Sequence, residues 1–404
     1  MYFFQLYCFY NIYISIKLNL LLLLLLKIKK SIIIGKKYKI INQQRRYNMP
    51  LLDINSKEQI KKYNQFLEKN NAFFTQMIEW GKVKNDWEQY VVYTCDDNNN
   101  IVMSANFIAK KLPFFKKIMV YSPRGPVGDV NNKEEVQRLL DELYKIIDKK
   151  SIFCVKFDPL IPKSDDLIEK YNKDGFKIRK NAQYNSLFYS KYNMCVNLEQ
   201  ENLEVLRLTF NQSTRRKIKL SEKEEYKFEI SNKTSDLKRF FNLYVKTNER
   251  KNLSGRKFEY LECMLNSLDP NNIKICVVSD KEGNDLASSI LIFYNDRVYY
   301  AYGATDVTKN SKNASYFMHW QTIKMSFEQG YKIYDMGVVN NPDVTDGVYL
   351  FKEGFCRSSG FFEAIGEIDF ITNHFIYNLF VYVLPLLKKA RRMFNKLLKL
   401  IKLK

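Results

Sequence analysis

The sequence predicts an α/β (α+β) protein built from two domains in tandem, and three observations lead to this prediction. The chain has 404 residues and a mass of 48.2 kDa, which is enough for two domains of ordinary size. Hydrophobic residues make up 46% of the chain, so each domain can bury a core. Apolar strand-like runs alternate with helical patterns from about residue 90, and the alternation restarts near residue 193. We therefore expect domain 1 at 49–192 and domain 2 at 193–359.

Domain 1 is expected to open with a helix capped by Ser56, because a Ser hydroxyl accepts hydrogen bonds from the free backbone amides of a helix start. Apolar strands follow, and the polar segment 96–100 connects the first two as a hairpin. The last strand leads into Asp158 and Pro159. The expected elements are a helix from Ser56 to about 69, strands at 90–95, 101–109 and 118–121, a helix at 133–148 and a strand at 151–157.

Domain 2 is expected to repeat this alternation. A helix at 203–224 carries a run of basic residues, and a later helix has Arg256 and Tyr260 four residues apart, hence on one face. The other expected elements are a strand at 227–230, a helix at 235–248, strands at 273–279, 287–294 and 298–303, a helix at 313–329 and a strand at 332–337.

The formal net charge of +21 is concentrated at the two ends of the chain. Residues 1–48 contain nine Lys or Arg, residues 375–404 contain eight, and neither segment has an acidic residue, which leaves +4 for residues 49–374. This distribution indicates that the ends contact a membrane or a polyanion and argues against a generally basic domain.

Residues 1–48 include seven consecutive leucines at 20–26. The apolar stretch 12–26 is interrupted by Lys17 and Asn19, is short for a bilayer-spanning helix, and is followed by no small-residue cleavage site. We expect this segment to be a non-native extension, translated from AT-rich non-coding DNA, with Met49 as the true start. A membrane anchor is the alternative.

The segment 386–403 has the pattern of a basic amphipathic helix, with apolar residues at helical spacing and cations on the opposite face. The segment 375–384 before it is apolar and aromatic, and Pro385 is expected to kink the chain or start a new helix. Such a helix is predicted to lie on an anionic membrane surface, and packing on its own domain is the alternative. The cations are Lys388, Lys389, Arg391, Arg392, Lys396, Lys399 and Lys402.

The seven cysteines form no Cys-x-x-Cys pair, and their odd number is typical of a reduced, cytosolic protein without a disulfide framework or zinc site. The two histidines, His319 and His374, offer little material for a His-dependent triad or a metal centre, and we expect His319 to be structural. We therefore expect no metal and no cofactor.

The stretch from Tyr334 to Phe355 is the most distinctive part of the chain. A strand ends at Gly337, a turn-rich loop follows, and a short helical turn carries Phe351 and Lys352 before Gly354 ends it. On the residues alone, this predicts one cation on a short support at the mouth of a sheet, with an ordinary surface Lys as the alternative.

This stretch resembles the C-terminal signature of the Fem-type (FemAB/FemX-like) aminoacyltransferases, which build peptidoglycan bridges. In that signature Tyr-Asp-x-Gly-Gly leads to Asp-Gly-x-x-x-Phe-Lys-x-Gly-Phe. The core 351–355 is intact here, whereas Val338 and Cys356 stand at positions where Gly is usual or common. The resemblance extends from about 49 to 369. It implies two GNAT-like domains of the compact branch without a helical arm, with 360–374 returning to complete domain 1.

The resemblance also implies substrate-binding residues. The run from Gln76 to Trp87 resembles the family's opening motif, and it places Lys84 and Trp87 at positions that contact the diphosphate-sugar end of the substrate. Arg256 and Tyr260 match positions that grip phosphates and the acceptor peptide.

Two further positions belong to this implied site. Lys156-Phe157-Asp158-Pro159 stands where the family has Arg-x-Asp-Pro, so Asp158 is expected to bind the acceptor peptide, and Tyr302 is the site residue of a Tyr-Gly segment with shifted spacing. The loop 121–127 matches a family turn, which we interpret as architectural. The basic run of the helix at 203–224 is expected to contact tRNA phosphates, with a solvated face as the alternative. That run comprises Arg215, Arg216, Lys217 and Lys219.

The reaction implied by the resemblance is attack by an amine of a peptidoglycan precursor, either lipid II or UDP-MurNAc-pentapeptide, on the ester of an aminoacyl-tRNA. No enzyme nucleophile is needed, because the ester is already activated. Lys352 is predicted to stabilise the oxyanion, with Phe351 packed beside it, and an alternative role is to position the tRNA terminal adenosine. Aminoacyl-tRNA is then a co-substrate, and we expect a monomer in the cytoplasm, peripheral on the inner face of the plasma membrane.

Two other functions compete with this one. An acyl-CoA N-acyltransferase of GNAT type would need a pyrophosphate loop of the form Arg/Gln-x-x-Gly-x-Gly/Ala, which we do not find in the sequence. A non-catalytic, membrane-associated polyanion-binding protein would keep the basic ends. It would have no need of Lys84, Asp158, Arg256 and Lys352 together, and their joint presence disfavours it.

Overall fold

The computed structural model describes residues 51–112, 115–173, 175–179, 192–251, 253–306, 313–340, 342–383 and Leu386. These residues belong to one compact unit, Pro50–Lys404. Our predictions for 1–48 and for a basic helix at 386–403 lie outside the described residues, apart from Leu386. Among the described residues, no helix has both the length and the apolar character needed to cross a membrane.

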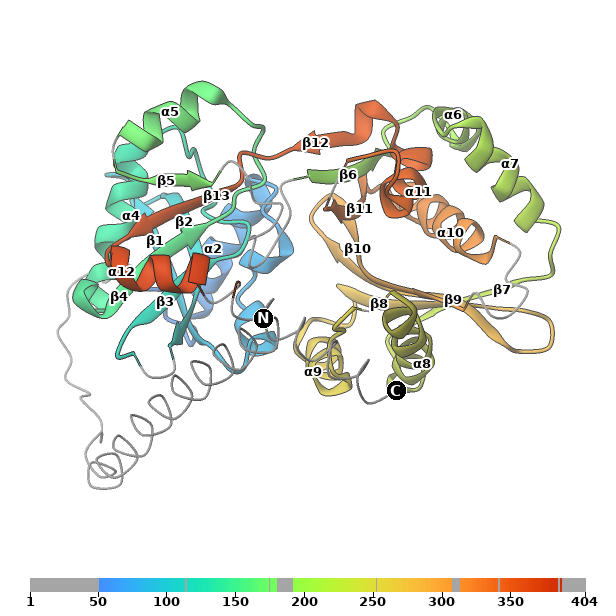
Figure 1. Cartoon of the computed structure of the whole chain (residues 1–404), viewed down its shortest axis with the longest axis horizontal. Helices are drawn as coiled ribbons and strands as arrows, with labels where there is room; N and C mark the ends of the chain where they lie inside the picture. The colour runs from blue at the N-terminus through green and yellow to red at the C-terminus, as the bar shows by residue number, and fades with distance from the viewer. Residues whose placement is uncertain are drawn as a thin grey trace, which may run out of the picture. The chain divides into compact units, whose positions relative to one another are not determined.

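Two mixed sheets with helices on their faces make up the described part of the chain, which confirms the predicted α/β class (Figure 1). Across the first sheet the strands are β1 (Glu88–Cys95), β2 (Ile101–Lys111), β3 (Ile118–Ser122), β4 (Ile152–Phe157), β13 (Glu367–Ile371) and β5 (Lys177–Arg179). Across the second sheet they are β12 (Phe361–Glu363), β6 (Tyr192–Asn197), β11 (Ile333–Val339), β10 (Arg297–Thr305), β9 (Asp285–Tyr294), β8 (Ile273–Ser279) and β7 (Lys227–Ser231).

Each sheet has a parallel pair whose strands are joined by a crossover helix. The pair β3–β4 is joined through α4 (Lys133–Ile146), and the pair β10–β11 through α10 (Ala314–Glu328). The amphipathic face of α4 buries Val136, Leu139 and Leu143 in the core of the first sheet. The remaining helical elements that precede β6 or follow β13 in the chain are α2 (Lys57–Lys69), η1 (Phe74–Gln76), α3 (Trp80–Val83), η2 (Lys149–Ser151), α5 (Asp165–Lys173), α12 (His374–Asn378) and η4 (Leu379–Val383).

Strand β13 comes from the far end of the chain and lies between β4 and β5, antiparallel to both. A buried ion cluster joins it to β4, because Lys156 of β4 contacts Glu367 at 2.8 Å and also pairs with Asp369. Buried charges need such partners, so this cluster ties the register of β13 to its neighbour. Residues 360–374 are expected from the sequence to return to domain 1, and β13 is where this segment enters the first sheet.

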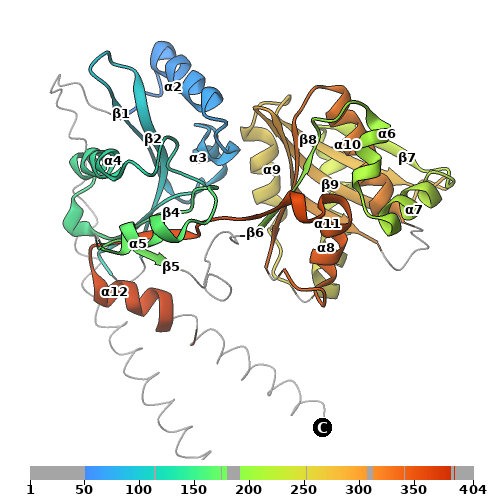
Figure 2. The ribbon, with the colours of Figure 1, turned by 90° about the horizontal axis from the view of Figure 1, so that it is seen from above.

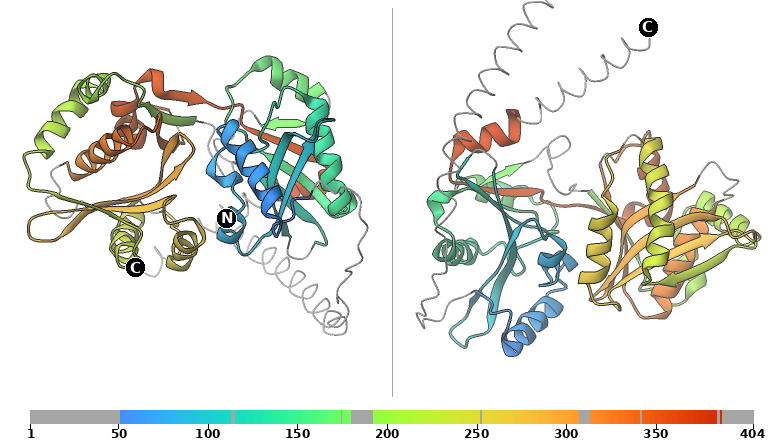
Figure 3. Two further views of the ribbon diagram at one scale, coloured as in Figure 1. Left: turned by 180° about the vertical axis from the view of Figure 1, so that it is seen from behind. Right: turned by 90° about the horizontal axis from the view of Figure 1, so that it is seen from below.

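Helices cover both faces of the second sheet. The helices α8 (Thr234–Lys251) and α9 (Phe258–Ser267) lie on one face, which Figure 3 shows from below. On the other face α10 packs with α6 (Leu203–Thr209), α7 (Gln212–Ser221) and α11 (Gly347–Cys356), as Figure 2 shows from above. Residues 268–272, all of which are described, connect α9 directly to β8, so no helical arm is inserted there. A 3-10 turn, η3 (Ser358–Gly360), leads from α11 to β12.

The single helix predicted at 203–224 is wrong, because the chain breaks it into α6 and α7. Phe210 adopts an extended backbone and buries its ring against Trp320 at 6.0 Å between centroids. Asn211 then caps α7 by accepting a hydrogen bond from the Thr214 amide at 2.7 Å. Asn at a cap competes well with helix continuation, and the buried Phe210 ring fixes the break.

The predicted end of the short helix at Gly354 is also wrong, since α11 continues to Cys356. Arg357, with φ of 56°, is the C-cap residue. Gly354 lies inside the helix, where an added Cβ would be 2.2 Å from Thr214 Oγ1. The glycine is needed for close packing of α11 against α7, and not for a left-handed cap.

Candidate active site

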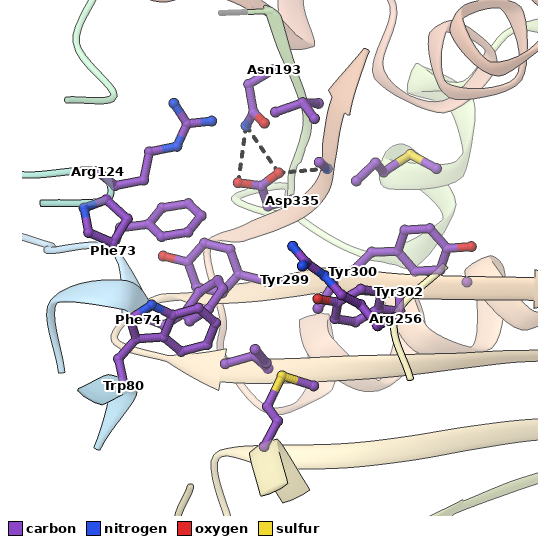
Figure 4. A pocket seen from close by; sticks show the side chains of 18 of the residues that line it. Phe73, Phe74, Trp80, Arg124, Asn193, Arg256, Tyr299, Tyr300, Tyr302 and Asp335 are labelled. Atoms are coloured by element: carbon purple, nitrogen blue, oxygen red, sulfur yellow. Dashed lines mark hydrogen bonds between the residues drawn. The ribbon is translucent and has the colours of Figure 1, made fainter. Parts of the chain in front are cut away.

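A cavity of about 490 Å³ is lined by residues of both sheets and of the elements around them (Figure 4). From the first sheet come Ile108 of β2 and Tyr121 of β3, and from the second come side chains of β6, β9, β10 and β11. Five of the residues predicted from the sequence line it. They are Lys84, Trp87, Arg256, Tyr302 and Lys352.

Lys352 projects from α11 into this cavity. Asp346 caps the helix by accepting hydrogen bonds from the amides of Val348 and Tyr349. The Lys352 side chain is buried, with 8% of its surface exposed, and its Nζ donates a hydrogen bond to the Val338 carbonyl at 2.9 Å. Burial lowers the pKa of Lys352 to about 8, although nearby Asp335 acts in the opposite direction.

The backbone of β11 is shaped to receive this cation. The register of β11 against β6 shifts between Asp335 and Gly337, and Gly337 has φ of +80°. A Cβ at Gly337 would lie 3.8 Å from Lys352 Nζ. An added Cβ would therefore fit at ordinary contact distance, and it is the positive φ that favours glycine at this position.

Beside Lys352, Asp335 is a buried carboxylate held by several donors. It accepts hydrogen bonds from Asn193 Nδ2 at 3.0 Å, from an Arg297 guanidinium nitrogen at 3.1 Å and from the Gly337 amide at 2.7 Å. Asn193 and Asp335 both line the cavity (Figure 4). Neither is among the site residues predicted from the sequence. The sequence feature that could have identified Asp335 is an acidic residue within the otherwise apolar strand 333–339.

Phe351 does not line the cavity, although it neighbours Lys352 in sequence. Its ring packs on Tyr316, His319 and Phe355, with centroid distances of 4.9, 5.2 and 5.5 Å. Phe351 thus fixes α11 on the core of the second sheet. His319 is buried and hydrogen bonded to Tyr334 Oη at 2.8 Å, and burial lowers the pKa of His319 to about 3, so the ring is neutral.

A second cationic group lies in the cavity wall around Tyr260. Lys84 Nζ donates a hydrogen bond to Tyr260 Oη at 3.0 Å, and the Arg256 guanidinium lies over the Tyr260 ring at 5.0 Å. Burial, and then the charge of Arg256, lower the pKa of Lys84 to about 8. Tyr260 itself lines an adjoining hollow of about 410 Å³ that shares Lys84 and Arg256 with the main cavity.

The predicted helical face for Arg256 and Tyr260 is wrong, because α9 begins at Phe258 and Lys257 is its N-cap residue. Arg256 precedes the helix, and its backbone amide donates a hydrogen bond to Tyr244 Oη at 3.1 Å. The side chains of Arg256 and Tyr260 meet nevertheless.

Trp87 and Tyr302 line the cavity as well. Lys110 Nζ lies 5.4 Å from the centre of the Trp87 ring. Burial raises the pKa of Tyr302, and the nearby Arg256 opposes this. Gly303, next to Tyr302, leaves room for the neighbouring Tyr300, since a Cβ there would be 1.5 Å from Tyr300 Oη.

Asp158 does not line the cavity, although two of its partners do. It accepts hydrogen bonds from the Arg124 amide at 2.6 Å and from Tyr121 Oη at 2.9 Å. Burial raises the pKa of Asp158 to about 6, against the effect of the Arg124 charge. The loop 121–127, interpreted from the sequence as architectural, therefore supplies three cavity residues, Tyr121, Pro123 and Arg124, and none of them is among the predicted site residues.

The basic run of α7 lies apart from this cavity. Arg215, Arg216 and Lys219 line a separate, open hollow of about 510 Å³ with Arg207, and none of them lines the main cavity. Lys217 Nζ donates a hydrogen bond to Tyr316 Oη at 2.9 Å. The contact of these cations with tRNA stays a prediction. Among the described residues, no group of His, Cys, Asp and Glu is arranged to hold a metal ion.

Comparison with known proteins finds relatives that are named as transferases. An alanyltransferase of Weissella viridescens, UDP-N-acetylmuramoylpentapeptide-lysine N(6)-alanyltransferase, is 27% identical over 335 residues, covering 81% of this chain and 98% of the relative. A lipid II:glycine glycyltransferase of Staphylococcus haemolyticus (strain JCSC1435) is 24% identical over 403 residues, covering 81% of this chain and 95% of the relative.

The fold also matches a solved structure. The crystal structure of FemX superposes with a TM-score of 0.70 at 21% identity, and the match covers 79% of this chain and 98% of FemX. The FemAB family model matches residues 57–280 and 274–384, which together span the two sheets. The resemblance carried by the motifs is confirmed, and the chain belongs to the FemAB family.

Proposed function

We propose that this protein is an aminoacyltransferase that joins an amino acid to the stem-peptide amine of a peptidoglycan precursor, with aminoacyl-tRNA as the donor. The relatives named above support the acceptor, since their names describe an alanyltransferase for UDP-N-acetylmuramoylpentapeptide-lysine and a glycyltransferase for lipid II. The observation that carries the proposal is one cavity that holds a buried cation, Lys352, together with a separate pair of cations, Lys84 and Arg256.

Lys84 and Arg256 suit the anionic end of the acceptor. Arg has a planar fork that fits phosphate oxygens, and Lys supplies a compact charge. Both cations face Tyr260, and Trp87 adds an apolar surface for a sugar or peptide. A diphosphate bound here orients the rest of the precursor along the cavity.

The charge of Lys352 suits the carbonyl oxygen of the ester, which becomes negative during the reaction. The acceptor amine attacks the ester carbon, the new C–N bond forms, the ester C–O bond breaks, and the tRNA ribose hydroxyl leaves with a proton from the amine. The carbonyl oxygen becomes negative in the tetrahedral intermediate. A Lys352 ammonium that now donates to a backbone carbonyl can donate to that oxygen instead, from a side chain that is itself buried.

The chemistry needs no nucleophile from the protein, because the ester is activated and the amine is the nucleophile. The contribution of the enzyme is alignment of two substrates and electrostatic stabilisation. Phe351 contributes to this alignment by fixing α11 on the core, and Gly337 by giving β11 the backbone angle that it has beside Lys352.

The test is a transfer assay with purified protein, a pool of aminoacyl-tRNAs, and either lipid II or UDP-MurNAc-pentapeptide, with products read by mass spectrometry. We expect a precursor heavier by one amino acid residue, formed only with charged tRNA. Parallel reactions receive acyl-CoA donors in place of tRNA. Product from acyl-CoA alone, or no product with any charged tRNA, would refute the proposal.

A further inference from the structure

Strand β11 has an irregularity directly beside Lys352. Its register against β6 shifts between Asp335 and Gly337, so Met336 is an extra residue between them. A bulge of this kind bends the strand and changes the direction of the groups beyond it. The Val338 carbonyl lies just beyond the bulge, and it accepts the hydrogen bond from Lys352 Nζ at 2.9 Å. The bulge therefore sets the position of the acceptor to which Lys352 is bound.

The side chain of Asp335 holds this bulge from both of its ends. Its Oδ1 accepts a hydrogen bond from the Gly337 amide, two residues further on, at 2.7 Å, as in an Asx turn. Asn193 of β6 is the ladder partner of Val338, and its side chain donates to both carboxylate oxygens at 3.0 Å (Figure 4). Asn193 thus connects the residue before the bulge with the residue after it.

The Asp335 carboxylate also carries a negative charge into the wall of the cavity. Its side chain is 2% exposed, and Arg297 of β10 donates to its Oδ2 at 3.1 Å. Hydrogen bonds and a cation of this kind stabilise a buried carboxylate in its charged form. Because Asp335 and Lys352 line the same cavity, this negative charge lies on the wall that holds the Lys352 amine.

Among the described residues, the other titratable groups that act on Lys352 supply no negative charge at about pH 8. Burial raises the pKa values of the two thiols and lowers that of the histidine, so all three are neutral. The fourth group is a cation, which repels the Lys352 ammonium. These groups are Cys195 on β6, Cys356 on α11, His319 on α10 and Lys251 on α8. Burial lowers the pKa of Lys352, and Asp335 is the charge that opposes this.

We propose that Asp335 is a positioning residue for Lys352, which it holds at the cavity wall and keeps in the protonated form. Its carboxylate shapes the bulge that presents the Val338 carbonyl to the amine. Its charge offsets part of the cost of burying the ammonium. The inference rests on the proposed function, in which the protonated amine stabilises the oxyanion.

The first test measures the protonation of Lys352 without any substrate. Asp335→Asn removes the charge and keeps nearly the same shape, and its amide oxygen can still accept from the Gly337 amide. Protein containing lysine with carbon-13 at Cε is titrated by NMR, and the Lys352 signal is identified by its absence from Lys352→Met. We expect the pKa of Lys352 to fall by about one unit in Asp335→Asn, which is a tenfold change in the protonation constant. This titration tests the inference even if the transfer assay fails.

The second test measures transfer in a Lys84→Arg background, where the fall above about pH 8 belongs to Lys352. Adding Asp335→Asn should lower kcat/KM, calculated per unprotonated acceptor amine, about tenfold at about pH 9. At about pH 6 the two proteins should be nearly equal, because Lys352 is protonated in both. A defect that is only structural would lower the activity by the same factor at every pH, and that result would count against the proposal.

Two further variants separate the charge from the position. Asn193→Ala keeps the carboxylate and removes a donor that holds it, so kcat should fall at every pH while the pKa of Lys352 changes little. Asp306→Asn removes another buried carboxylate at the end of β10, which pairs with Lys246 at 3.1 Å and does not line the cavity. It should leave the pKa of Lys352 and the pH profile unchanged.

Thermal unfolding checks that each variant is folded, and Asn193→Ala still tests the positioning role if Asp335→Asn does not fold. An unchanged pKa of Lys352 in Asp335→Asn, or an equal fall in Asp306→Asn, would overturn the inference. Activity of Asn193→Ala at the level of the wild type over the whole pH range would show that the clamped bulge does not position Lys352.

Discussion

The side-chain amine of Lys352 donates a hydrogen bond to the backbone carbonyl of Val338 at 2.9 Å. This bond joins the middle of α11 to the end of β11 and holds a buried cation at the cavity wall. Because a carbonyl dipole is a weaker partner than a negative oxygen, an oxyanion in the cavity can replace it. In the mechanism that we propose, the bond keeps the cation in position until the intermediate forms.

Replacing Lys352 with Met should abolish most transfer while preserving the fold. Loss of a group that donates to the oxyanion lowers kcat by about 10²–10³-fold. The Met side chain has a similar volume and removes a buried charge, so thermal stability should not fall. Steady-state kinetics and thermal unfolding measure the two effects. Lys238→Met, at an exposed Lys on α8, is the control and should be active. Turnover of Lys352→Met at the wild-type rate would remove Lys352 from the chemistry.

The pH dependence of activity should show the loss of a cation. Burial lowers the pKa values of Lys84 and Lys352 to about 8, so kcat/KM, calculated per unprotonated acceptor amine, should fall as pH rises through about 8. Lys84→Arg keeps its charge, and any fall that it still shows belongs to Lys352. The range from about pH 7 to about pH 10 spans the pKa values of both lysines. If this kcat/KM did not change over that range, a role for either ammonium would be contradicted.

The free energy of unfolding should rise with pH over the range in which the activity falls. The folded pKa values of these two lysines are lowered from the ordinary value of 10.5 to about 8, so the unfolded chain binds more protons between about 8 and 10.5. Their contribution to the free energy of unfolding therefore rises with pH in that window. Denaturant unfolding of the wild type and of Lys352→Met at several pH values measures the difference, which should be smaller in the variant.

Substitutions at the second cationic group should affect the acceptor and not the chemical step. Tyr260→Phe removes the oxygen that Lys84 contacts, and Lys84→Met removes the charge itself. Both should raise KM for the nucleotide- or lipid-linked precursor, with the larger effect in Lys84→Met, while kcat changes little. Lys82→Met, an exposed position of α3, is the control and should match the wild type. An unchanged KM in Lys84→Met would separate this residue from the phosphates.

Two glycines of α11 should respond in opposite ways to the same change. At Gly354 an added methyl would be 2.2 Å from Thr214 Oγ1, so Gly354→Ala should destabilise the protein by about 1–3 kcal/mol through overpacking. At Gly347 nothing lies within 4 Å of the added atom, so Gly347→Ala should be neutral or stabilising by up to about 1 kcal/mol. Denaturant unfolding compares them. Equal stability of the two variants would show that α11 does not pack closely on α7.

The ion cluster between β4 and β13 should be important for stability. Lys156→Met leaves Glu367 and Asp369 buried without their cation, and loss of one partner of a buried pair costs about 3–5 kcal/mol. Lys173→Met breaks an exposed pair with Glu169 and should change the free energy of unfolding by at most about 0.5 kcal/mol. Thermal unfolding compares the two variants. A mild effect at Lys156 would mean that β13 is held mainly by backbone pairing and apolar contacts.

Much of the fold followed from local signals. Strands such as β8 and β9 are predicted within a few residues of their bounds, because apolar alternation and polar turns are local properties. The break between α6 and α7 is not predictable in this way, because Phe210 fits a helical pattern equally well. Only its burial against Trp320 and the Asn211 cap determine where the helix ends.

The sequence by itself determined the family and the chemical character of the site, because Lys84, Arg256 and Lys352 stand in motifs that can be recognised in one dimension. Only the tertiary structure decided which side chains share a cavity. Asn193 and Arg124 line it from strands and loops far from those motifs, whereas Phe351, next to Lys352 in sequence, faces the core. The physical reason is that helical and strand periodicity assigns a residue to a face, and only packing between elements determines what that face meets.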